Sequence, residues 1–190
     1  MRNLKIDDKD RKKASFAAVL DVEGRGNQHQ EIARHQSERG ARLVVVAGLV
    51  WLGPRLIVQR RACDGRHGAG RLELPGGKLE LGESPTVGLR RELGEEWGTA
   101  AAELRIGAVV DVLHHVYPAP GPEILLIVLS VRAPARQGRT WVQKIVTEPG
   151  AKIETYLPYE LPIEQFLAAD QPFIRGVMTG APSAHLEGVP

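Results

Sequence analysis

Apolar and β-branched positions fall into short runs that predict strands on either side of one central helix. Two runs, 42–50 and 55–60, are separated by a short segment with a Gly-Pro pair, which is typical of a hairpin. Further runs predict strands at 105–113 and 123–132, and a weaker one near 152–157. Strands before and after a helix indicate an α/β domain with a mixed sheet.

The central helix is expected to run from Pro85 to about Trp97. Ser84 is a favourable N-cap residue, and proline is well tolerated at the first helical position. Gly98 is a favourable C-terminal stop. This stretch therefore carries its own start and stop signals.

The chain divides by composition into three parts. Residues 1–40 are polar and lack sustained apolar periodicity, so we expect a weakly ordered leader. A folded domain is expected over 41–180, closing with a short helix after Asp170, and 181–190 would be a tail.

Charge and apolar runs exclude several classes. The formal net charge of +2 lies within residues 1–40, and the remaining chain is neutral, so no stable nucleic-acid binding is expected. The longest apolar runs, 43–52 and 124–129, are too short to span a membrane. The start is a poor export signal, so we expect a cytoplasmic protein that does not associate with membranes. Cys63 is the only cysteine, which excludes an intrachain disulfide.

The central helix carries three glutamates on one arc: Glu92, Glu95 and Glu96. At about 100° per residue, Glu96 lies roughly 20° from Leu89, beside the apolar stripe that ends at Trp97. A solvated face does not usually place a charge there. Like charges four residues apart also repel one another.

Two arginines precede these glutamates, and the helical wheel predicts that Arg90 and Arg91 point away from them. A hard divalent cation, Mg²⁺ or Mn²⁺, would supply the missing positive charge, because such ions take carboxylate oxygens as ligands. The alternative is a solvated helix surface, the more common outcome for an isolated acidic run.

The glutamates belong to a longer pattern. Its fixed positions are Gly77, Glu83, Arg91, Glu92, Leu93, Glu95, Glu96 and Gly98. The pattern resembles the Nudix box, the signature of the Nudix hydrolases, and only Thr99 departs from the usual aliphatic residue. The resemblance implies a Nudix-type α/β/α sandwich with a mixed β-sheet and the Nudix loop-helix. It also implies an enzyme that splits a pyrophosphate bond in nucleotide derivatives, with Mg²⁺ or Mn²⁺ as cofactor.

The resemblance also implies roles for individual residues. The implied metal ligands are Gly77, through its carbonyl, and the side chains of Glu92, Glu95, Glu96 and, from a later loop, Glu148. The implied catalytic group is Glu83, Arg91, Glu92 and Glu95. Within it, Glu92 is our choice of general base, and Arg91 is expected to pair with Glu83.

Outside the box, the chain is most similar to the MutT-like branch, which hydrolyses nucleoside triphosphates to monophosphates. The implied substrate contacts are Arg60, Arg61, Lys78 and Asp170. A guanidinium suits phosphate, and Asp170 would read the base. The structural alternatives are a solvated strand end for the arginines and a helix N-cap for Asp170. Leu74 stands where the branch usually has an aromatic residue.

Other assignments stay open at this point. Tyr117, eighteen residues beyond Thr99, is compatible with a dinucleoside polyphosphate hydrolase. The ADP-ribose branch usually has proline where this chain has His115. A non-catalytic Nudix-fold nucleotide-binding module is disfavoured, because all four box carboxylates are present. His114, His115 and Tyr117 are interpreted as strand residues, and the partner as a small-molecule nucleotide bound by a monomer or homodimer.

Overall fold

A computed structural model describes residues 42–65, 67–134 and 138–180 of this chain. The predicted leader, 1–40, and the predicted tail, 181–190, lie outside the described residues. The predicted domain limits therefore stay a prediction, as do the cytoplasmic location and the oligomeric state. No helix in the described ranges is long and apolar enough to cross a membrane.

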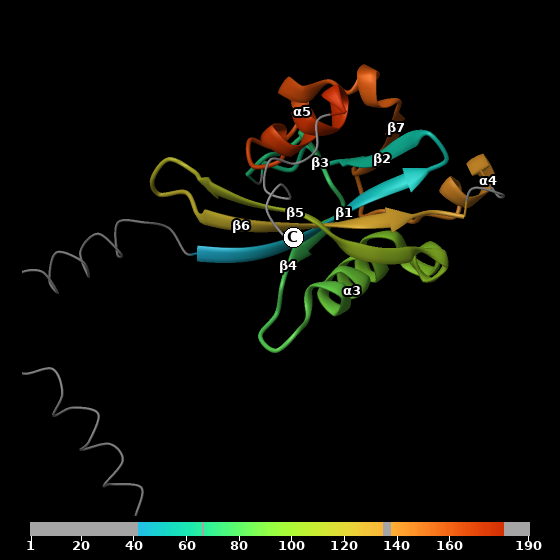
Figure 1. The fold of residues 1–190 in the computed structure, drawn as a ribbon, viewed down its shortest axis with the longest axis horizontal. Coiled ribbons are helices and arrows are strands. Elements are labelled where there is room, and N and C mark those ends of the chain that lie inside the picture. Colours follow the sequence, from blue (N-terminus) through green and yellow to red (C-terminus); the bar gives the residue numbers. More distant parts are fainter. Residues whose placement is uncertain (1–41, 66, 135–137, 181–190) are drawn as a thin grey trace, which may run out of the picture. The chain divides into compact units, whose positions relative to one another are not determined.

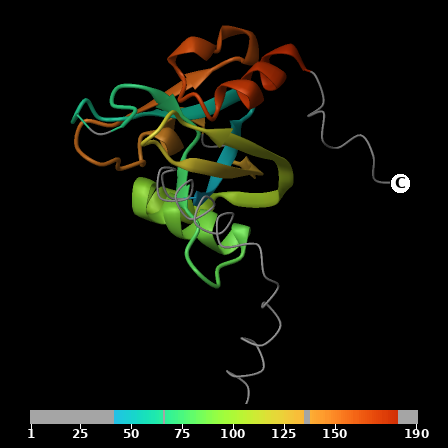
Figure 2. The same cartoon turned by 90° about the vertical axis from the view of Figure 1, so that its left-hand side faces the viewer.

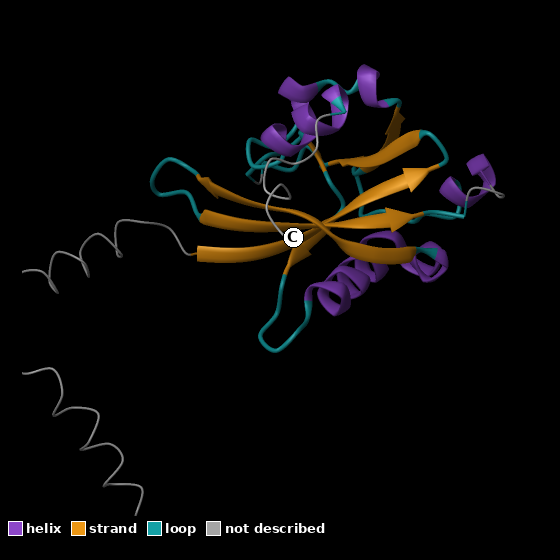
Figure 3. Cartoon of the chain, viewed as in Figure 1, coloured by secondary structure: helices purple, strands orange, loops and turns teal. Residues whose placement is uncertain are grey.

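Within the described residues, four strands precede the first helix, and three further strands follow it (Figures 1 and 3). The strands are β1 (Arg42–Leu52), β2 (Arg55–Arg60), β3 (Leu72–Glu73), β4 (Gly76–Lys78), β5 (Arg105–Val116), β6 (Glu123–Arg132) and β7 (Lys152–Tyr156). The helices are α3 (Pro85–Trp97), α4 (Gly138–Val142) and α5 (Gln171–Thr179), with 3₁₀ turns η1 (Gly98–Glu103), η2 (Pro158–Glu160) and η3 (Ile163–Gln165).

One mixed sheet contains all the described strands. Five follow the order β3-β2-β1-β6-β5, while β4 pairs with β1 and β7 pairs with β2. β1 and β6 are parallel, from Arg42 beside Glu123 to Trp51 beside Arg132, and the other pairings are antiparallel. β2 pairs only with the last three residues of β1, and β4 pairs with 45–47 on the same edge. Because β2 and β4 share one edge of β1, the glycine-rich strand β4 lies beside the middle of β1, where it contacts α3.

The sheet separates two apolar cores, one on each face. Val46 and Val50 of β1 pack with Leu93 of α3 on one side. Ala47, from the same strand, packs with Phe173 of α5 on the other side. Two views show α3 and α5 on opposite faces (Figures 1 and 2). The predicted α/β/α arrangement with a mixed sheet is confirmed.

Local sequence signals fix the ends of α3 as predicted. The Ser84 hydroxyl accepts a hydrogen bond from the Val87 N–H at 3.4 Å, and Gly98 ends the helix with φ +61°. The predicted strand at 105–113 is three residues longer in the structure. β4, α4 and the 3₁₀ turns were not predicted. β4 was missed because glycine is a weak indicator of a strand, and its pairing with β1 depends on contacts distant in sequence.

Candidate active site

The acidic face of α3 lies against two glycines of β4. The N–H of Gly76 donates to Glu96 Oε2 at 3.1 Å. Gly76 has φ +146°, and a Cβ there would overlap the Val46 carbonyl oxygen. A Cβ on Gly77 would overlap the carboxylate of Glu92. Gly76 therefore has no tolerated substitute, because its Cβ would meet backbone, whereas a side chain at Gly77 would displace the Glu92 carboxylate.

Arg91 joins the acidic residues of the box. Its Nε and Nη2 donate to the two oxygens of Glu83 at 2.8 and 2.9 Å, as predicted. Its Nη1 donates to Glu92 Oε1 at 2.9 Å and reaches Glu95 at 3.4 Å. The expectation that Arg91 points away from the glutamates is therefore wrong, because its long side chain folds back over them. Nη2 also donates to the carbonyl of Lys78 at 2.9 Å, which ties α3 to the end of β4.

The ion pair between Arg91 and Glu83 also fixes the loop that precedes α3. The Arg91 hydrogen bonds lower the pKa of Glu83 to about 2, and the N–H of Glu80 contributes to the shift. Glu83 in turn is the first cause of the raised pKa of Arg91. The box loop is thus fastened to the helix by charge-assisted hydrogen bonds.

Glu96 differs from its neighbour Glu95 in burial. Glu96 is half-buried, whereas 61% of the Glu95 side chain is exposed. Glu96 Oε1 accepts a hydrogen bond from Gln59 Nε2 at 3.3 Å. Burial raises the pKa of Glu96 to about 8, and the charges of Glu73 and Glu92 act in the same direction. A bound cation would favour the ionised form.

The oxygen-rich neighbourhood of Glu92 and Glu96 fits a hard divalent cation in kind, because Mg²⁺ and Mn²⁺ prefer carboxylate and carbonyl oxygens. Among the described side chains, however, no three His, Cys, Asp or Glu residues are arranged to hold a metal ion. Arg91 contacts the carboxylate of Glu92 and balances part of its charge. Exposed Glu148, before β7, lies near enough to Glu73 to raise the pKa of that carboxyl. The five predicted metal ligands therefore stay a prediction.

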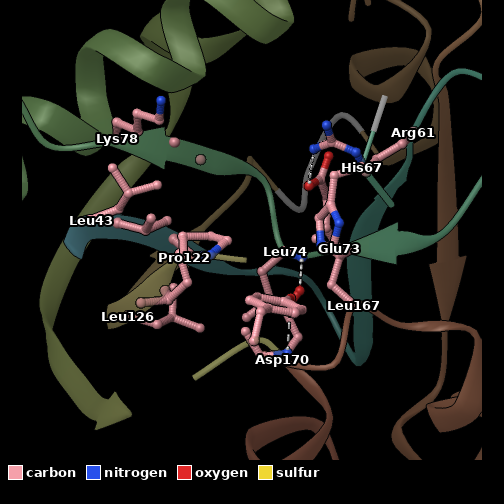
Figure 4. A pocket seen from close by; sticks show the side chains of 17 residues that line it. Leu43, Arg61, His67, Glu73, Leu74, Lys78, Pro122, Leu126, Leu167 and Asp170 are labelled. Atoms are coloured by element: carbon pink, nitrogen blue, oxygen red, sulfur yellow. Dashed lines mark hydrogen bonds and ion pairs between the residues drawn. The ribbon is translucent and has the colours of Figure 1, made fainter. Parts of the chain in front are cut away.

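Glu92, Glu96 and the two glycines of β4 form what we call the acidic cradle. A cavity of about 410 Å³ adjoins it (Figure 4). Gly76, Gly77 and Lys78 line one part of it, and Leu74 and Asp170 line another. The structure thus brings Lys78 and Asp170 to one cavity. Gly76 and Gly77 line this cavity and also contact Glu96 and Glu92.

Asp170 is the most buried acid of the cavity, with 5% of its surface exposed. It occupies the N-cap position of α5, but its side chain makes no capping hydrogen bond. Instead its Oδ2 accepts a hydrogen bond from the N–H of Leu74 at 3.3 Å (Figure 4). Burial raises the pKa of Asp170 to about 7, with a further contribution from the charge of Glu73. A carboxyl group held there is suited to recognising a polar ligand edge.

The two predicted phosphate-binding arginines lie in different places. Arg61 lines the cavity, where its Nη1 donates to Glu73 Oε2 at 2.7 Å. Arg60 is not among the residues that line the cavity. It donates to Glu154 and to the carbonyl of Gly70 at 2.9 Å. The geometry favours a structural role for Arg60, because the ion pair with Glu154 holds β2 against β7.

Three polar residues that line the cavity were not among the predicted site residues: Glu73, His67 and Tyr117. Tyr117 was interpreted as a strand residue, but β5 ends one residue earlier. Its hydroxyl accepts from the Ala169 N–H at 3.4 Å, and its ring lies edge-on to His67 at 4.8 Å. The signal for Glu73 was present, since a charge stands between leucines in the short strand beside the box.

Several known proteins are similar to this chain in sequence or in fold. The putative 8-oxo-dGTP diphosphatase 2 of Mycobacterium tuberculosis is 44% identical over 64 residues, 34% of this chain and 45% of that protein. The 8-oxo-dGTP diphosphatase of Escherichia coli is 51% identical over 43 residues, 23% of this chain and 33% of that protein. The chain thus spans less than half the length of these curated relatives.

A solved MutT protein from Methanosarcina mazei Go1 superposes with a TM-score of 0.56 at 18% identity, over 76% of this chain and 98% of that one. At that identity the likeness shows the fold alone. The NUDIX domain family matches residues 42–176, which is most of the chain. The family predicted from the box is confirmed, and the chain belongs to the NUDIX domain family.

Proposed function

We propose that this protein is a Mg²⁺- or Mn²⁺-dependent pyrophosphohydrolase that converts nucleoside triphosphates to monophosphates and pyrophosphate. One observation carries the proposal. The cavity that contains Asp170 is lined by Gly76 and Gly77, the backbone against which Glu96 and Glu92 lie. A nucleotide could therefore place its base near Asp170 while its phosphates reach the acidic cradle.

Each residue of the cavity and the acidic cradle would have a separate role in hydrolysis. A divalent cation held by Glu92 and Glu96 would neutralise phosphate charge and lower the pKa of a bound water. Lys78 and Arg61 line the same cavity and would attract the phosphates. Glu92 is our choice of general base. Its Oε1 is held by Arg91 at 2.9 Å, which fixes the orientation of the carboxylate.

The names of the two relatives favour modified purine nucleotides as substrates. The position of Tyr117 on the cavity wall keeps a second candidate, a dinucleoside polyphosphate, because an aromatic ring could stack on an additional base. A panel of nucleotides separates these possibilities.

We expect purified protein with Mg²⁺ to release pyrophosphate from at least one nucleoside triphosphate. The panel should hold unmodified and 8-oxo purine triphosphates, CTP, a methylated pyrimidine triphosphate, ADP-ribose and diadenosine polyphosphates, read by product chromatography. Activity confined to the last two would overturn the triphosphate assignment. Nucleotide binding without hydrolysis would indicate a binding module instead.

Substituting Asp170 tests the proposed base end. Asp170→Ala should raise the nucleotide KM about tenfold or more, the size expected from losing a hydrogen bond to a charged group. Turnover at saturating nucleotide should change little, because Asp170 is assigned to the base and not to the phosphates. Asp111→Asn is a matched control, since Asp111 is also buried but contacts the N–H of Val112 outside the cavity. An unchanged KM for Asp170→Ala would contradict the assignment.

The raised pKa of Asp170 gives a second measurement. A carboxyl whose pKa rises from 3.8 to about 7 on folding destabilises the fold progressively as pH rises through that window. Asp170→Asn keeps an acceptor for Leu74 but cannot ionise. The melting temperature of Asp170→Asn, measured by circular dichroism, should therefore increasingly exceed that of wild type as pH rises from 4 to 7.

A further inference from the structure

Gln59 is a buried amide between two acidic side chains of the site. It lies on β2 with 3% of its surface exposed. Its Nε2 donates to Glu96 Oε1 at 3.3 Å. Its cross-strand neighbour on β3 is Glu73, whose pKa the Gln59 amide acts to lower. One side chain thus binds an acid of the proposed metal site and lies beside an acid of the cavity wall.

Trp97 determines which way this amide faces. The indole N–H is a donor only, and it lies 3.0 Å from Gln59 Oε1. Because the indole requires an acceptor, the Gln59 oxygen must face Trp97 and its N–H groups must face the carboxylates. Trp97 is fully buried and packs edge-on to Trp141, with ring centroids 6.1 Å apart, so the donor itself is held in place.

The hydrogen bonds to Glu96 hold both of its oxygens. Gln59 donates to Oε1, and the Gly76 N–H donates to Oε2 at 3.1 Å. An ionised carboxylate has about four acceptor sites. Each oxygen therefore keeps capacity for a further partner, while the orientation of the group is fixed from two sides.

We propose that Gln59 is a positioning residue that, oriented by Trp97, holds Glu96 in the geometry that binds the divalent cation. The proposal rests on the proposed function. Residues that orient metal ligands through hydrogen bonds typically change metal affinity about 10- to 100-fold when they are removed. An amide that served only to satisfy the indole would change folding stability but not metal affinity.

The test is a substrate-free Mn²⁺ titration of the full chain, with free Mn²⁺ measured by electron paramagnetic resonance. Gln59→Met keeps the length of the side chain and removes its polar groups. It should weaken Mn²⁺ binding about tenfold or more. In turnover assays it should raise the Mg²⁺ concentration for half-maximal rate, with little change in the nucleotide KM.

A pair of tryptophan variants separates orientation from packing. Trp97→Phe removes the donor that orients Gln59 and should weaken Mn²⁺ binding by a smaller factor, about threefold to tenfold. Trp141→Phe is the matched control. Trp141 is equally buried, but its indole donates to the Ala100 carbonyl at 3.2 Å, so its loss should lower the melting temperature and leave Mn²⁺ binding unchanged.

The outcomes distinguish this inference from the proposed function. If wild type and Glu96→Gln bind Mn²⁺ equally, the metal site of the proposed function fails. If Glu96→Gln loses affinity while a folded Gln59→Met keeps it, only the role of Gln59 is overturned. Should Gln59→Met not fold, Trp97→Phe decides. Wild-type affinity in that variant, or an equal loss in Trp141→Phe, overturns the proposal.

Discussion

Glu96→Gln should lower turnover at saturating Mg²⁺ by at least about a hundredfold while the protein stays folded. The structure gives the reason for both effects. Glu96 is the half-buried acid of α3, held by the Gly76 N–H and by Gln59 beside the glycines of the cavity wall. Glutamine has almost the same shape but is a far weaker ligand for a hard cation. Steady-state kinetics with a full Mg²⁺ titration measures the loss.

The same variant should be more stable than wild type when no metal is present. The pKa of Glu96 rises from 4.5 to about 8 in the folded protein, chiefly through burial and then through Glu73 and Glu92. Ionisation therefore disfavours the fold progressively as pH rises from about 4.5 to 8. The melting temperature of Glu96→Gln should equal that of wild type at pH 4 and exceed it at pH 8. Added Mg²⁺ should narrow the difference at pH 8, because it stabilises only wild type.

A surface glutamate provides the control for this experiment. Glu164 is 83% exposed and pairs only loosely with Arg175, at 3.5 Å, away from the cavity. Glu164→Gln should retain wild-type turnover and show no comparable pH-dependent gain in stability. Near wild-type turnover for Glu96→Gln at saturating Mg²⁺ would contradict a metal-binding role for Glu96.

The parts of the fold that carry local signals could be predicted from the sequence. Helix α3 has a cap at Ser84, a stop at Gly98 and a 3.6-residue apolar period between them, so its bounds followed. The half-buried position of Glu96 beside that apolar stripe followed from the same period. The pairing of Arg91 with Glu83, which the resemblance to the Nudix box implied, is also present in the structure.

The remaining features depend on contacts that no local pattern encodes. Gln59 and Trp97 are 38 positions apart and meet only because β2 lies over the end of α3. Tyr117 lines the cavity because the turn between β5 and β6 lies against Ala169, a residue 52 positions further along the chain. The reach of Arg91 was missed for another reason. A helical wheel gives the direction of Cβ, but the long side chain bends back to its neighbours.

Arg91→Ala should reduce turnover about a hundredfold and also lower the melting temperature near neutral pH. This guanidinium donates to both oxygens of Glu83, to Glu92 and to the carbonyl of Lys78. Without it, Glu92 and Glu95 lose their nearest cation and repel one another, and the box loop loses its attachment to α3. Thermal melts and steady-state kinetics on the same preparation measure the two effects.

Two further variants and a change of pH identify the cause. Arg91→Lys keeps the charge but cannot reproduce the two-point contact with Glu83, so its turnover should fall between those of wild type and Arg91→Ala. Arg90→Ala, a change at the exposed neighbouring position, should leave turnover unchanged.

The pKa of Glu83 is lowered from 4.5 to about 2, so the stability gained from its pairing is complete above about pH 4.5 and is lost as pH falls toward 2. The difference in melting temperature between wild type and Arg91→Ala should therefore shrink across that window. A difference independent of pH, or equal losses of turnover in Arg90→Ala and Arg91→Ala, would contradict a role for the Arg91–Glu83 pair in holding the box.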